Sequence, residues 1–103
     1  MKLRWTLVAR DDLKRIQRYV ARDKREAAKR WVQRLRRRAR DAARTPGSGR
    51  VVPEFNDSDI REVIVGDYRI VYRVERGEVV VLTVFEGHKL LSIRREDTGK
   101  PVR

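Results

Sequence analysis

Residues 60–86 constrain the fold of this chain more than any other segment, because they read as three β-strands joined by two tight turns. Apolar residues dominate three runs, at 60–65, 68–75 and 78–86. Gly66-Asp67 and Arg76-Gly77 supply the short turns that hairpins favour. The sequence therefore predicts an antiparallel three-stranded sheet in the C-terminal half of the chain.

The middle strand of this sheet carries apolar and cationic side chains on opposite faces, because successive strand residues alternate. Tyr68, Ile70, Tyr72 and Val74 share one face, and Arg69, Val71 and Arg73 share the other. The first face predicts a hydrophobic core. The two arginines, together with Arg61 on the preceding strand, have three readings: a solvated strand face, a phosphate-binding site, or a docking surface for an acidic partner.

The N-terminal half predicts a short strand followed by two helices. Residues 2–5 alternate in polarity, and Thr6 suits the cap position of a helix. The first helix has an apolar stripe at helical spacing, made by Ala9, Leu13, Ile16 and Val20. The second helix, predicted over about 25–44, has a stripe made by Ala28, Trp31, Leu35, Ala39 and Ala42. Trp5 and Trp31 are expected in the core.

These elements predict an α+β domain of order β-α-α-β-β-β, in which a two-helix hairpin covers one face of the C-terminal sheet. The other face is left for Arg69 and its neighbours. Residues 45–59 read as a loop, with a short extended piece at 50–55. The domain is expected to span 1–93, followed by a basic C-terminal tail at 94–103.

The net charge of the chain is +12, which attracts polyanions such as nucleic acid, an acidic protein or an anionic membrane. The charge is most concentrated on the outer face of the helix predicted over 25–44. That face carries Lys29, Arg30, Arg34, Arg36, Arg37, Arg38, Arg40 and Arg44. It serves solubility alone, or it awaits an anionic partner.

Several classes of protein are excluded by what the sequence lacks. It contains no cysteine, so disulfides, thiolate zinc sites and cysteine nucleophiles are ruled out. We expect neither a metal nor a cofactor. The first residues lack the apolar core of a secretory signal, and the longest apolar run, at 79–85, has the length of a strand. We therefore expect a soluble cytoplasmic protein with no membrane association.

Residues 3–91 resemble the RelE/ParE superfamily of toxins from bacterial type II toxin–antitoxin systems. The resemblance depends on T-x-x-A-x-x-D-L-x-x-I-x-x-Y-V from Thr6 to Val20, GRVVPEF at 49–55, IREVIVGDYRIVYRV at 60–74 and VVVLTVFEGHKLL at 79–91. It implies the RelE/ParE-like fold and a cognate antitoxin whose C-terminal segment wraps the toxin. The positive charge of the chain leads us to expect an acidic antitoxin.

One arm of the superfamily, the RelE-like arm, cuts mRNA in the ribosomal A site. Such cleavage needs a base for the 2′-OH, cations for the phosphorane and an acid for the leaving oxygen. The resemblance assigns Arg69 to the arginine after the turn, whereas Glu62 and Lys89 stand where a lysine and an arginine are usual. If the chain is a nuclease, Glu62, Arg69, His88 and Lys89 form its catalytic set, with Glu62 as base and His88 as acid.

The other arm, the ParE-like arm, poisons DNA gyrase and has no established catalytic residues. The strings at 60–74 and 79–91 are more similar to this arm. In this reading the residues that bind the target or a phosphate are Arg61, Arg69, Arg73, His88 and Lys89. The ribosome and its mRNA are the alternative target, and a member that has lost toxicity and acts only beside its antitoxin, or as a DNA-binding accessory, is a third reading.

Overall fold

The computed structural model describes residues 1–87, so His88, Lys89 and the tail predicted at 94–103 lie outside the described residues. The elements are β1 (Lys2–Trp5), α1 (Leu7–Ala21), α2 (Arg25–Arg44), a 3-10 turn (Pro46–Ser48), β2 (Arg50–Val51), β3 (Ile60–Val65), β4 (Tyr68–Glu75) and β5 (Glu78–Glu86). The predicted α+β order is confirmed. The extended piece expected at 50–55 contains the two-residue strand β2.

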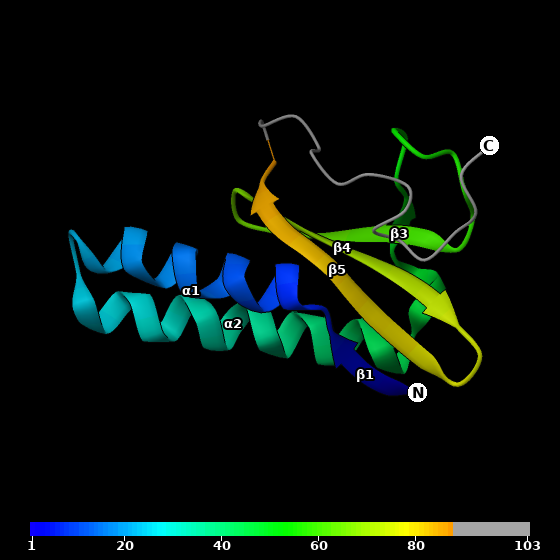
Figure 1. Cartoon of the computed structure of the whole chain (residues 1–103), viewed down its shortest axis with the longest axis horizontal. Coiled ribbons are helices and arrows are strands. Elements are labelled where there is room, and N and C mark those ends of the chain that lie inside the picture. Colours follow the sequence, from blue (N-terminus) through cyan, green and yellow to red (C-terminus); the bar gives the residue numbers. More distant parts are fainter. Residues whose placement is uncertain (88–103) are drawn as a thin grey trace.

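The strands form one five-stranded sheet in the order β1-β5-β4-β3-β2. Pairs β3–β4 and β4–β5 are antiparallel, as the hairpin turns predict, and β2–β3 is an antiparallel pair that was not predicted. Strand β1 pairs parallel with β5, with Lys2 opposite Glu78 and Trp5 opposite Val81. The first strand therefore lies beside the last strand of the described residues (Figure 1).

The start of α1 is fixed to the part of the β5 edge that β1 does not cover. The Thr6 hydroxyl oxygen accepts a bond from the Ala9 backbone N–H at 3.1 Å, which confirms the predicted cap. The same hydroxyl donates to the Leu82 carbonyl at 3.0 Å. Further along, a buried Asp12 carboxylate oxygen accepts from the Val84 backbone N–H at 2.9 Å and from the Thr83 hydroxyl at 2.6 Å. These bonds satisfy edge groups of β5 that would otherwise lack partners.

The main core lies between the two helices and one face of the sheet, as predicted. The buried helix residues Ala9, Leu13, Ile16, Leu35, Ala39, Ala42 and Ala43 pack on Val63, Val65, Tyr68, Ile70, Tyr72, Val79, Val81 and Val84. Trp5 and Trp31, expected in the core, are half-buried at its margin. Trp31 meets Tyr68 edge to face, with 5.8 Å between ring centroids.

The opposite face of the sheet holds a second apolar cluster that the sequence analysis did not predict. Its buried members are Val52, Ile60, Val71, Val80 and Leu82, and Phe55 and Phe85 pack against them. Val52 and Phe55 belong to the segment between β2 and β3, which therefore packs on this face. The face that was expected to be open is covered in part by its own connecting loop.

Candidate functional site

Two of the predicted site residues, Glu62 and Arg69, meet on the second face of the sheet in a closed cluster of charges. The Arg69 Nε donates to Glu62 Oε1 at 2.6 Å. Its two terminal nitrogens, Nη1 and Nη2, donate to the two carboxylate oxygens of Glu54 at 3.0 and 3.1 Å. Arg50 forms an ion pair with the other oxygen of Glu62. We call Arg50, Glu54, Glu62 and Arg69 the charge cluster.

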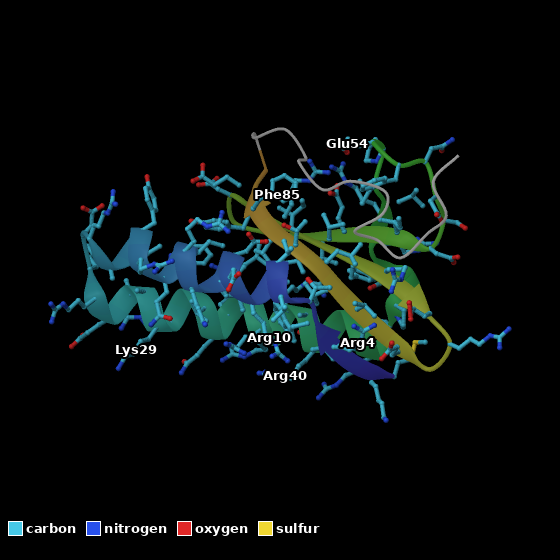
Figure 2. All side chains as sticks on the ribbon, in the orientation of Figure 1. Arg4, Arg10, Lys29, Arg40, Glu54 and Phe85 are labelled. Carbon is cyan, nitrogen blue, oxygen red and sulfur yellow. The ribbon has the colours of Figure 1, made fainter. Side chains whose placement is uncertain are left out.

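Arg69 is enclosed on its flat side as well as at its edges. Its guanidinium carbon lies 5.0 Å from the centroid of the Phe85 ring, a cation–π arrangement. Figure 2 shows Glu54 and Phe85 on the same side of the molecule, near the far end of β5. As a result Arg69 is only 7% exposed and Glu62 only 1% exposed. A substrate reaches these groups only by displacing their partners.

The electrostatics of the Glu54–Arg69 pair favour its ionised state. The hydrogen bonds from Arg69 are the main reason that the pKa of Glu54 is lowered from 4.5, against a smaller opposing effect of burial. The hydrogen bond to Glu54 is in turn the first cause that raises the pKa of Arg69. Each group thus holds the other in its charged form.

The other two arginines named with Arg69 are also held by contacts within the protein, but the three do not share one face as expected. Arg61 lies opposite Tyr72 and so is on the helix-covered face, whereas Arg73 is on the face of Arg69. Arg73 is buried and forms an ion pair with Glu75, and its Nε has no hydrogen-bond partner within the described part of the chain. Arg61 donates to the Gly49 carbonyl at 2.8 Å and so fixes the loop before β2. The reading of a solvated strand face is therefore wrong for Arg69 and Arg73. Binding of a target by these residues stays a prediction.

Sequence reasoning missed the two partners that close the cluster, Arg50 and Glu54. Both lie within the GRVVPEF string, and Arg50 pairs across the sheet with Glu62. The signal available was the presence of opposite charges on two segments that both carry the family resemblance. The sequence does not say which of these charges pair. Glu54 and Arg69 are 15 residues apart, and their contact depends on the path of the loop between β2 and β3.

An apolar hollow lies where β1 leads into α1. It has a volume of about 400 Å³ and is lined by Arg4, Trp5, Thr6, Leu7, Val8, Arg10 and Leu82. Leu7 is 77% exposed and Val8 is 48% exposed, so two large apolar side chains face solvent at its rim. Arg4 and Arg10, both labelled in Figure 2, line the same hollow. We call this feature the α1 hollow; it combines apolar contact area with two cations.

A second, more cationic hollow lies between α2 and the end of β3. It has a volume of about 280 Å³ and is lined by Arg34, Arg37, Arg38, Asp41, Ile64, Val65 and Gly66. Three arginines thus line one concavity, with Asp41 as its single lining acid. We call this feature the α2 hollow. It is suited to an anion.

Two further observations concern residues 1–87. They contain no group of three or more histidine, aspartate or glutamate side chains placed to hold a metal ion. No helix among them is long and apolar enough to cross a membrane.

Comparison with known proteins gives one family and a related fold. Residues 3–91 match the family model described as "ParE toxin of type II toxin-antitoxin system, parDE". A solved structure described as "Chromosomal ParDE TA system from P. aeruginosa" contains a chain of similar fold, with a TM-score of 0.70 at 24% identity. The match covers 84% of this chain and 95% of that one. No curated protein sequence matches.

Proposed function

The chain belongs to the ParE toxin family of type II toxin–antitoxin systems, and from this premise we propose that it inhibits DNA gyrase and that a cognate acidic antitoxin neutralises it. Gyrase inhibition needs a surface that binds a protein and no proton transfer by the toxin. The RelE-like alternative, cleavage of mRNA on the ribosome, needs proton-transfer groups that face an accessible phosphate.

The closed charge cluster is the main observation that favours gyrase inhibition over mRNA cleavage. The only base named for the nuclease among residues 1–87 is Glu62, and its two carboxylate oxygens are taken by Arg50 and Arg69. Arg69, which in the nuclease reading would stabilise the charge of the phosphorane, donates from both Nη atoms to Glu54. A base and a cation that satisfy each other inside the protein are poorly placed to act on RNA, which favours an inhibitor without catalysis.

The α1 hollow is the site that best suits the antitoxin. Specific protein interfaces are centred on apolar side chains that become fully buried, with charged residues at the rim. Leu7 and Val8 supply the exposed apolar centre, and Arg4 and Arg10 supply cations at the rim for antitoxin carboxylates. Both proposed partners act on the chain in the cytoplasm.

The experiment is a direct comparison of two activities of the purified full-length chain. We expect it to block supercoiling by purified gyrase without ribosomes and to leave mRNA intact on purified ribosomes. His88→Gln removes the only histidine and the acid named for the nuclease but keeps a hydrogen-bonding side chain at a proposed target-binding position, so under gyrase inhibition it should leave supercoiling inhibition and growth arrest nearly unchanged. Ribosome-dependent mRNA cleavage that is lost in His88→Gln would overturn the proposal in favour of the RelE-like reading.

The antitoxin part is tested separately. Leu7→Ser removes the most exposed apolar side chain of the α1 hollow, and Tyr19→Ser removes another exposed large side chain of the same helix as a matched control. We expect the first change alone to weaken binding of the cognate antitoxin. Equal affinity in both variants would place the antitoxin elsewhere without affecting the gyrase result.

A further inference from the structure

The exposed side of α2 is a strongly cationic surface, interrupted by the single acid Asp41 between Arg37 and Arg44, that neither gyrase inhibition nor antitoxin binding explains. Arg30, Arg34, Arg37 and Arg44 follow one another at offsets of four, three and seven, so they lie along one side of the helix. At 1.5 Å per residue this row is about 21 Å long. Glu26 and Asp41 are the only acids in the helix. We call this row, with Arg38 of the adjoining α2 hollow, the α2 arginine face.

The charges of this face are not neutralised within residues 1–87. Arg44 approaches Asp41 at 4.0 Å, and no other cation of α2 forms an ion pair with a described residue. Two arginines of the helix are instead stacked on tryptophans: Arg34 lies 5.0 Å from the centroid of Trp31, and Arg36 lies 5.9 Å from that of Trp5. Stacking fixes the guanidinium plane and leaves its N–H edge to donate, which lowers the entropy lost when an anion binds.

We propose that the α2 arginine face binds the phosphodiester backbone of duplex nucleic acid and that the α2 hollow seats one phosphate between Arg34, Arg37 and Arg38. Guanidinium groups bind phosphate oxygens through paired N–H donors, and three arginines line this hollow of about 280 Å³. Duplex DNA carries one charge per about 1.7 Å of axis with both strands counted, so about 21 Å of duplex holds on the order of a dozen phosphates, of which the row meets those on the side it approaches.

The composition of the face favours nucleic acid over an acidic protein. Every exposed position of α2 holds a charged residue or Gln33, whereas a protein interface needs a buried apolar centre. Ile64, at the edge of the α2 hollow, is the one exposed large apolar side chain among the residues that line it. The α1 hollow has the apolar centre that the α2 arginine face lacks. Figure 2 shows Lys29 and Arg40 also projecting from α2 away from the sheet.

A duplex suits this face better than a single strand, because α2 exposes no aromatic ring on which bases could stack. Single strands are held largely by aromatic rings on which the bases stack. The only aromatic residue of α2, Trp31, is half-buried and is covered by Arg34. A straight cationic helix without exposed rings suits the regular phosphates of a duplex. DNA and RNA duplexes share this backbone chemistry, so both are compared in the test.

The test measures binding of the full-length chain to four probes by fluorescence anisotropy as a function of salt. The probes are a 20-base-pair DNA duplex, the same duplex as RNA, single-stranded DNA of that length, and a polyglutamate peptide of equal charge. The test variant is Arg30→Gln/Arg34→Gln/Arg37→Gln. The control, Lys14→Gln/Arg18→Gln/Arg22→Gln, removes the same charge from exposed positions at α1 and its C-terminal cap.

We expect tight duplex binding that falls steeply with salt. Each phosphate contact contributes a slope of about 0.9 in log K against log salt, so the test variant should lower the slope by about 2.7. If affinity at 1 M salt is unchanged, this corresponds to roughly 500-fold weaker binding at 0.1 M. Asp41→Asn should tighten duplex binding, because it removes the acid that lines the α2 hollow.

The outcomes separate the proposal from its alternatives. Binding of DNA and RNA duplexes that is lost in the test variant alone supports it, and a preference between them identifies the natural source of the phosphates. Equal losses of duplex affinity in the test and control variants, or no loss in either, would mean that binding does not depend on the α2 arginine face, and would overturn the proposal. Tighter binding of polyglutamate than of either duplex would assign the face to an acidic protein. Tighter binding of single-stranded DNA than of either duplex would contradict the proposal that the face recognises a duplex. None of these readouts depends on gyrase inhibition.

Discussion

Replacing Arg69 with alanine should destabilise the protein severely, because the change strands a buried carboxylate. The Glu62 side chain is 0% exposed and would keep only Arg50, whose own side chain is 64% exposed. Removing one partner of a buried ion pair typically costs about 3–5 kcal/mol, a large share of the 5–15 kcal/mol that stabilises a domain of ordinary size. At about 4–8 °C per kcal/mol, the melting temperature should fall by roughly 12–40 °C.

The assay is thermal and urea denaturation of the purified variants, followed by circular dichroism. Arg69→Ala/Glu62→Gln should recover more than half of the loss, because no buried charge then lacks a partner. Glu54→Gln should cost about 1 kcal/mol or less, since the Glu54 side chain is 41% exposed. A fall of less than 4 °C in Arg69→Ala, or a double variant no more stable than the single one, would refute the buried cluster. If Arg69→Ala is destabilised as expected, a loss of toxicity in this variant reports that the fold is lost and does not show that Arg69 contacts the target.

Three further predictions concern a turn, the acid response and the antitoxin. Gly66→Ala should destabilise more than Gly77→Ala: both have positive φ, but a Cβ at Gly66 would lie 2.7 Å from Cη2 of Trp31, whereas nothing lies within 4 Å at Gly77. Equal shifts in melting temperature would contradict that contact. Because the pKa of Glu54 is lowered from 4.5, the stability it contributes is complete above that pH and is lost as the pH falls through the folded-state value, so Glu54→Gln should flatten the urea-derived stability profile below about 4.5. Salt should slow association with the acidic antitoxin more than it speeds dissociation, and a salt-independent on-rate in stopped-flow mixing would argue against electrostatic steering of a chain of charge +12.

The element order and most boundaries could be predicted because they follow from local rules. Strand alternation, two glycine turns and the apolar stripes of the helices each act over a few residues, and α2 and β3 to β5 have the predicted ranges. The parallel pairing of β1 with β5 was outside those rules, because it joins the two ends of the described chain.

The site was harder to predict, because alternation assigns a residue to a face but does not say what covers that face. Arg69 shares a face with Val71, as expected, yet its burial depends on the path of the loop that carries Val52 and Glu54. One signal was available. The run VVVLTVF at 79–85 is apolar at nearly every position, and such runs are typical of strands buried on both faces.

The pairing of β1 with β5 has a consequence for how the toxin is made. Arg4 and Glu78, which bond across this pair, are 74 residues apart in the chain. At about 5–20 residues per second, a ribosome needs roughly 4–15 s to synthesise the interval, and contacts of such separation form slowly afterwards. Strand β1 cannot pair until β5 has been synthesised, so the sheet cannot form completely before then. A truncated or stalled chain without β5 therefore lacks the partner of β1 and one of the two partners of β4, so the sheet closes only after β5 has been synthesised.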